Sequence, residues 1–312
     1  MTQKLMKKEE LKDFIEDLIK KYDIIAPVKK DNISKFEIVD SFKDICLDEM
    51  PTQIPLKKFL IKENETLFEF KNNNIIKPKI ERRKKIIFGA RKCDLNGIYI
   101  MDSLMHDLLY KERRKNIILI GMYCDKPNDY CFCNSMELID FYDLFFYPFE
   151  DKYYISIGSK KGLGLVKGLK EAEKEIKLEI KNKKKLLNKD ILKEYNNPLW
   201  EEDSKKCLGC AACTAYCPTC NCFDIEDYIE IENIKKGKRI RKTTSCFLRE
   251  FSEVAGGKIY RENRKNRFKH FVYHKISFYK RHYGKFMCVG CGRCIRVCPA
   301  RIDWVDTINK IK

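Results

Sequence analysis

Two cysteine motifs in the last third of the chain constrain its fold more than any other feature of the sequence. Each has the pattern C-x2-C-x2-C-x3-C-P, in which one loop wraps three closely spaced cysteines around an iron–sulfur cubane. The motifs contain Cys207, Cys210, Cys213 and Cys217, and Cys288, Cys291, Cys294 and Cys298. Zinc knuckles use two pairs of ligands per site and would not require a four-cysteine run that ends in Cys-Pro. The spacing therefore predicts two [4Fe–4S] clusters rather than two structural zinc sites.

The fourth cysteine of each motif is expected to serve the other motif's cluster, because in two-cluster proteins the cysteine before the proline ligates the opposite cluster. Cluster 1 is thus assigned to Cys207, Cys210, Cys213 and Cys298, and cluster 2 to Cys288, Cys291, Cys294 and Cys217. Four basic residues would raise the cluster potentials if they lie close: Lys205, Lys206, Arg293 and Arg296.

Composition narrows the class of protein. The 312 residues and 44% apolar content allow two domains with cores of their own. Sixteen cysteines fit metal binding in the reducing cytosol better than disulfides. No apolar run is long enough to cross a bilayer and no secretory signal is recognisable, so we expect a cytoplasmic protein without a membrane partner. The net charge of +18 comes without a nucleic-acid readout motif, and we expect no nucleic-acid partner.

The first two thirds of the chain carry a mixed pattern of helices and strands. Apolar residues recur at helical spacing in residues 9–21, and residues 86–88, 95–109 and 116–122 predict a βαβ unit. Residues 147–149 and 153–157 predict a hairpin, and the Lys/Glu-rich residues 165–187 predict a helix. The helix breakers at Asn196 to Pro198 mark a domain boundary. The predicted class is α+β, with a mixed α/β domain at 1–195 and an α-helical ferredoxin-like dicluster domain at 196–312.

A second group of thiols is expected in the N-terminal domain. Cys93 and Cys124 each follow the carboxyl end of a predicted strand, where ligands collect in open α/β sheets. Cys131 and Cys133 lie only a loop away, so the four thiols could converge on zinc or a third iron–sulfur cluster. The alternative is four small buried residues that line a sheet edge.

The remaining chemistry-bearing residues give weaker signals. Cys220, Cys222 and Cys246 are interpreted either as buried thiols near the first cluster or as exchangeable ligands for another metal. The four histidines are scattered, and the chain has no P-loop and no Ser-His-Asp order. We therefore expect the chain to catalyse no bond-making step itself.

The chain resembles the beta subunit of archaeal sulfhydrogenases and the dicluster electron-transfer subunit of anaerobic sulfite reductase over nearly its whole length. The resemblance is carried by PLKKFL at residues 55–60, FGARKCD at 88–94, CFC at 131–133 and both cysteine motifs, in this order. It implies a subunit that relays electrons between a flavin-bearing subunit that oxidises NAD(P)H and a catalytic redox subunit, such as a hydrogenase or sulfite reductase.

Two other functions stay open at this point. One is a stand-alone oxidoreductase with a substrate-binding cluster at the N-terminal thiols, which a site with three thiolates and an open position would favour. The other is a redox-sensing or nucleic-acid-binding module that uses the basic segments.

Overall fold

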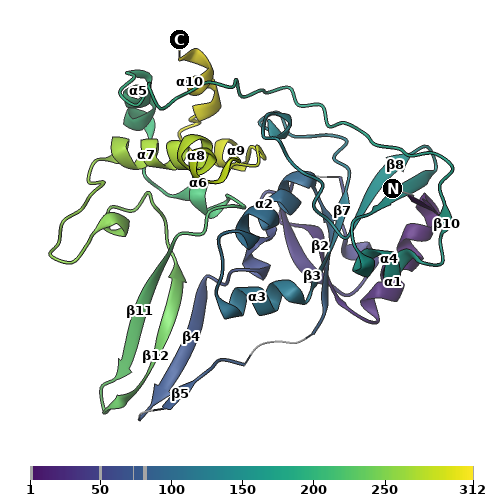
Figure 1. Cartoon of the computed structure of the whole chain (residues 1–312), viewed down its shortest axis with the longest axis horizontal. Helices are drawn as coiled ribbons and strands as arrows, with labels where there is room; N and C mark the ends of the chain where they lie inside the picture. Colours follow the sequence, from purple (N-terminus) through teal and green to yellow (C-terminus); the bar gives the residue numbers. More distant parts are fainter. Residues whose placement is uncertain (1–2, 49–50, 73, 80–82, 312) are drawn as a thin grey trace.

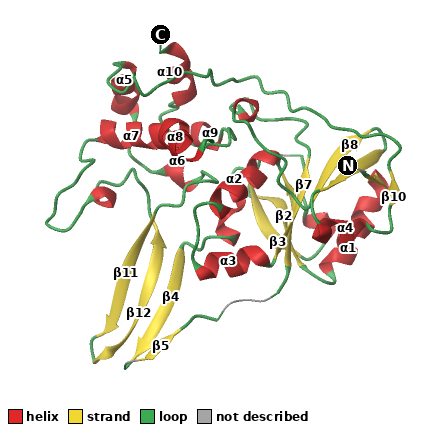
Figure 2. Cartoon of the chain, in the orientation of Figure 1, coloured by secondary structure: helices red, strands yellow, loops and turns green. Residues whose placement is uncertain are grey.

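The molecule consists of two β-sheets and a group of short helices that carries the cysteine motifs (Figures 1 and 2). The computed structural model describes residues 3–48, 51–72, 74–79 and 83–311. Within these residues, no helix is long and apolar enough to cross a membrane.

The larger sheet has eight strands in the order β10-β1-β9-β8-β7-β6-β2-β3. Its strands are β1 (Lys4–Lys7), β2 (Asp23–Lys30), β3 (Ile33–Val39), β6 (Lys85–Ala90), β7 (Ile117–Met122), β8 (Leu144–Phe149), β9 (Lys152–Ile157) and β10 (Lys170–Glu171). The four strands from β2 to β8 run parallel in the middle of the sheet, and the outer pairs are antiparallel. Every residue of β7 is buried, as expected for a central parallel strand covered on both faces.

Alternating side chains of the central strands feed two separate cores. Ile86 and Ile120 pack on the face covered by α1 (Leu11–Ile19) and α4 (Lys160–Val166). Ile87 and Leu119 point to the opposite face, where they pack with apolar residues of α2 (Lys92–Asp102). This is the period-two alternation of a pleated strand. It fixes the start of α2 at one edge of the sheet.

Two local predictions for the N-terminal region are confirmed. Strands β6 and β7 pair in parallel, with α2 and α3 (Leu108–Lys115) between them, which is the predicted βαβ unit. Strands β8 and β9 pair antiparallel around Glu150, which takes the left-handed conformation that a tight hairpin turn requires.

The predicted helix at residues 165–187 is wrong beyond residue 166. After α4 the chain forms only β10 and then runs without regular structure to Pro198 (Figure 1). Ile176, Leu178 and Ile180 are partly buried against apolar clusters, at the period of two residues that an extended chain gives. The Lys/Glu content favours a helix, but tertiary burial of these alternate residues overrides the propensity.

The smaller sheet corrects the expectation that residues 196–312 are helical between the motifs. It has the order β11-β12-β4-β5, with β4 (Asn64–Lys71), β5 (Asn74–Ile76), β11 (Phe223–Glu230) and β12 (Asn233–Thr243). Alternating Phe223, Ile225 and the residues after them carried a strand signal that the basic composition obscured. Because β12 pairs with β4, residues on both sides of the predicted boundary share one sheet. The boundary at 195/196 stays a prediction.

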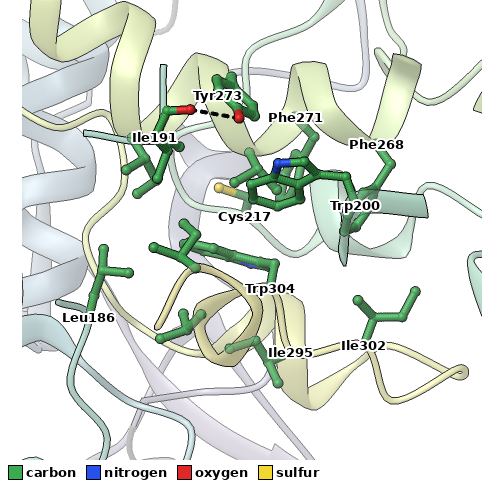
Figure 3. Close-up of a cluster of buried hydrophobic side chains, with 14 of the residues drawn as sticks. Leu186, Ile191, Trp200, Cys217, Phe268, Phe271, Tyr273, Ile295, Ile302 and Trp304 are labelled. Atoms are coloured by element: carbon green, nitrogen blue, oxygen red, sulfur yellow. Dashed lines mark hydrogen bonds between the residues drawn. The ribbon is translucent and has the colours of Figure 1, made fainter. Parts of the chain in front are cut away.

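The helical part surrounds an aromatic core. Its helices are α5 (Leu199–Lys206), α6 (Ala212–Ala215), α7 (Arg264–Tyr273), a π-helical turn (His274–Phe278), α8 (Tyr279–Tyr283), α9 (Arg293–Arg296) and α10 (Trp304–Lys310). Trp200, Tyr273 and Trp304 are almost completely buried in it (Figure 3). The Tyr273 hydroxyl donates a hydrogen bond of 2.8 Å to the Ile191 carbonyl, which ties the extended segment to this core.

A buried charge network joins the smaller sheet to α3. Glu65 on β4 pairs with Arg241 on β12 and with Arg113 on α3, and Arg241 also contacts Asp107 at 2.9 Å. Glu65 and Arg241 each keep only 5% of their side-chain surface exposed.

Replacing Glu65 with Ala is expected to loosen this sheet, because it leaves two guanidinium groups short of a buried partner. Breaking a buried pair costs about 3–5 kcal/mol, and Asp107 should hold the effect near the lower end. Hydrogen–deuterium exchange should show faster amide exchange in residues 233–243. Glu69→Ala, an exposed change on the same strand, is the control. Equal exchange in both variants would contradict the prediction.

Candidate iron–sulfur centre

The two cysteine motifs adopt the same backbone conformation. In each, the residue two after the first cysteine is a glycine with positive φ, Gly209 at 68° and Gly290 at 63°. Each glycine N–H donates a 3.4 Å hydrogen bond to the sulfur of that first cysteine, Cys207 or Cys288. The residue two before the third cysteine also has positive φ, and a single-turn helix follows it, α6 or α9. The repeated spacing is therefore also a repeated loop.

The first loop closes around a small cavity. Leu208, Ala211 and Phe247 line it together with four cysteines, Cys207, Cys210, Cys213 and Cys298. Cys298 thus joins the three cysteines of the other motif, and these are the four residues assigned to cluster 1 from the sequence. Burial raises the pKa of the Cys207 and Cys213 thiols. Cys210 is exposed, so this site lies near the surface.

The second loop receives Cys217 from the first motif. The Cys217 charge acts on the thiols of Cys288, Cys291 and Cys294, and burial raises the pKa of all three, that of Cys288 to about 12. The Trp304 indole N–H donates a 3.4 Å hydrogen bond to the Cys294 sulfur. Such N–H to sulfur bonds are among the features that set iron–sulfur potentials. Cys217 also influences Cys213, so it lies at the junction between the two quartets.

Lys275 is a buried cation at this junction that sequence analysis missed. Its Nζ donates a 3.0 Å hydrogen bond to Thr219 Oγ1 and also bonds to Cys217. Burial alone would lower the pKa of Lys275, but Cys217 and neighbouring thiols raise it well above its usual value, which keeps the charge. Lys275 lies in a π-helical turn, and such turns are frequent at functional sites. No short-range motif could have found it.

The basic residues named from the sequence have different fates. Arg293 is buried, and its charge acts on the Cys291 thiol. Lys205, Lys206 and Arg296 are exposed. Of the four, only Arg293 is in a position to influence a cluster from within the protein.

The four N-terminal thiols lie beside the second loop. Cys93, Cys124, Cys131 and Cys133 are all buried. The charge of Cys133 acts on the thiols of the other three, and Cys291 in turn influences Cys93, Cys131 and Cys133. Burial raises the pKa of each, that of Cys124 to about 11, so all are neutral thiols at pH 7 unless they are ligated.

Backbone contact explains why the second loop has glycines. The Phe132 N–H donates a 2.8 Å hydrogen bond to the Gly290 carbonyl. A Cβ at Gly290 would lie 2.6 Å from the Cys133 Cα, and one at Gly292 would lie 2.5 Å from the Tyr130 carbonyl oxygen. Any other residue at either position would force the two loops apart.

The described residues contain no group of three or more His, Cys, Asp or Glu side chains spaced to hold a single metal ion. His270 and His274 stack on each other, and burial lowers the pKa of both to about 4. The thiols near Cys133 are therefore spread more widely than zinc requires, whereas a cubane places its ligands farther apart than one ion does.

A cavity of about 600 Å³ lies next to the N-terminal thiols. Tyr123, Cys133, Tyr147 and Ile180 line it, with Lys92 and Lys177 at its edge. Both lysines are paired with Asp140, at 2.8 Å each.

A buried ion pair connects the N-terminal thiols to the second loop. Arg293 Nη2 lies 2.8 Å from Asp94 Oδ1, and both side chains are at most 2% exposed. Arg293 also donates to the Thr52 carbonyl at 2.7 Å and to the Thr52 hydroxyl at 3.1 Å. Asp94 directly follows Cys93, so the pair holds the start of α2 against the second motif.

Arg293→Met is expected to destabilise the protein by about 3–5 kcal/mol, because the Asp94 carboxylate would stay buried without its partner. The double variant Asp94→Asn/Arg293→Met should recover part of this loss in thermal unfolding. Arg296→Met, on the exposed face of the same helix, should change little. A single variant as stable as the wild type would show that the pair does not hold this junction.

Comparison with known proteins agrees with this geometry. Residues 206–302 match the model of the family described as 4Fe-4S dicluster domain. Sulfhydrogenase 2 subunit beta of Pyrococcus furiosus is 33% identical over 316 aligned positions, which cover 93% of this chain and 92% of that protein. No solved structure matches the chain. The chain therefore belongs to the sulfhydrogenase beta-subunit family.

Proposed function

We propose that this chain is the electron-transfer subunit of an oxidoreductase complex. The observation that carries the proposal is the pair of identical cysteine loops whose fourth cysteines are exchanged. When bound, [4Fe–4S] clusters supply one-electron carriers. The protein's own contribution is to hold them close together, exclude water from one and leave the other near the surface.

The proposed ligands follow the observed grouping. Cluster 1 takes Cys207, Cys210, Cys213 and Cys298, which share one cavity. Cluster 2 takes Cys288, Cys291, Cys294 and Cys217, which influence one another. These two loops, with the helices around them, form the proposed α-helical ferredoxin-like dicluster fold, from which the β11–β12 hairpin projects (Figure 1).

A third iron–sulfur cluster is proposed at Cys93, Cys124, Cys131 and Cys133. Its support is the mutual proximity of four buried thiols that are not spaced for a single ion. The Arg91 guanidinium, whose charge acts on Cys124, would offset the negative charge that such a cluster brings. The three sites then form a row in which cluster 2 is central, because Cys291 contacts the N-terminal group through Cys131 and Cys217 influences the first loop.

The ends of this row indicate where partners act. Cys210 and the 65% exposed Leu208 open cluster 1 to the surface. The large cavity beside Cys133 lies at the other end. The proposed partners are a flavoprotein subunit that oxidises NAD(P)H and a catalytic redox subunit, and this protein is proposed to work in the cytoplasm.

The cavity beside Cys133 also supports a second candidate. A stand-alone oxidoreductase would bind a substrate there, next to an iron–sulfur cluster with an open position. Electron transfer that needs no catalytic partner subunit would favour this function over the relay.

Iron analysis tests the number of clusters. Three cubanes predict about twelve irons per anaerobically purified chain and two predict about eight. Cys210→Ala should remove about four irons and leave the N-terminal site loaded, and Cys124→Ala should remove about four from that site alone. Cys46→Ala is the control thiol. An unchanged count in Cys124→Ala with eight irons in the wild type would refute the third cluster, and an iron-free wild type would refute the relay.

Replacing Lys275 with Met is expected to lower the reduction potential of cluster 2, because the buried cation favours the more negative reduced state. One charge about 7 Å away at an effective dielectric constant of about 20 contributes roughly 2 kcal/mol, on the order of 100 mV for one electron. Redox titration followed by electron paramagnetic resonance measures it.

Lys269→Met is the matched control for this measurement. Lys269 is also buried, but its ammonium lies 3.6 Å from the Tyr195 ring centre and donates to the Tyr195 carbonyl rather than to a cysteine. Potentials that do not differ between the two variants would contradict a tuning role for Lys275.

A further inference from the structure

Outside the cluster sites, two cysteines form a close pair. Cys222 precedes β11 and Cys246 follows β12, so the base of the hairpin brings them together. The pairing of Phe223 with Thr243 continues into a 3.0 Å hydrogen bond from the Thr244 N–H to the Cys222 carbonyl. The two thiols are hydrogen-bonded to each other. A backbone ladder thus holds two side chains that have no role in the proposed relay.

The two thiols differ in their access to solvent. Cys222 is partly exposed and lines a cavity of about 280 Å³, whereas Cys246 is buried behind it and does not line the cavity. The bonds that Cys222 accepts from the Cys246 thiol and backbone N–H lower its pKa to about 6. An accessible thiol of low pKa with a buried thiol behind it is the arrangement of a thiol–disulfide exchange site.

The cavity is basic. Lys57, Lys58 and Lys242 line it, against one carboxylate, that of Glu63. Lys57 donates to the carbonyls of Thr214 and Cys220, at 3.1 and 3.3 Å, so its charge is held at the cavity wall. Such a cavity attracts anions.

We propose that Cys222 and Cys246 form a redox-active dithiol that reacts with small anionic disulfides entering this basic cavity. The Cys222 thiolate attacks one sulfur of the disulfide and expels the first thiol, which leaves a mixed disulfide on Cys222. The Cys246 thiol then attacks the Cys222 sulfur and expels the second thiol. One disulfide is reduced to two thiols, and the Cys222–Cys246 bond takes its place. The couple lies beside the first motif, because Cys246 and Cys213 influence each other electrostatically.

Glutathione disulfide is a suitable probe, because it is small and carries carboxylates. The reduced, cluster-loaded protein is incubated anaerobically with it, alkylated, digested and analysed by mass spectrometry. The expected product is a peptide cross-linked through Cys222 and Cys246. Cys246→Ser should instead trap glutathione on Cys222, and Cys46→Ser should behave as the wild type.

Charge provides a second readout. The variant Lys58→Met/Lys242→Met should slow cross-linking by glutathione disulfide roughly tenfold but leave the rate with uncharged hydroxyethyl disulfide unchanged. Absence of the cross-link, or glutathionylation of Cys46 as fast as that of Cys222, would overturn the proposal. So would loss of iron from Cys222→Ser, which would assign this thiol to a metal. Iron content followed in parallel keeps the result separate from the fate of the proposed clusters.

Discussion

The ion pair between Asp94 and Arg293 is the contact on which the arrangement of the molecule depends. It links the first turn of α2, set by the large sheet, to the single-turn helix of the second cysteine loop. A buried pair gives little net stability, but neither partner tolerates loss of the other. It therefore acts as a positional constraint, and the close backbone contact between residues 130–133 and Gly290 depends on the same alignment.

Short-range patterns predicted much of this structure. The βαβ unit and the β8–β9 hairpin follow from apolar runs and turn residues, and the cysteine spacing predicted two quartets that the fold brings together. The failures share one cause. Residues 176–180 are extended because distant apolar clusters bury alternate side chains, and β12 is a strand because β4 completes its sheet. Neither partner is visible in a local window.

The candidate site shows the same division. The eight motif cysteines and the four N-terminal thiols were identifiable from spacing and from strand ends. Lys275 was not, since it lies outside both motifs and reaches Thr219 only through the packing of the π-helical turn. The pairing of Cys222 with Cys246 likewise depends on a hairpin that composition obscured. Motifs thus identify ligands, whereas the charges and thiols around the ligands depend on tertiary structure.

The exchange of fourth cysteines also has a consequence for biosynthesis. On the proposed assignment, the first loop leaves the ribosome with three of its four ligands and waits for Cys298, while Cys217 waits for the whole second loop. Neither site is complete until the second motif has been synthesised. The segment around Cys131 and Cys133 emerges much earlier and presents the surface against which Gly290 and Gly292 close. Maturation is therefore tied to the end of translation, so a stalled or truncated chain would hold only partial, labile sites.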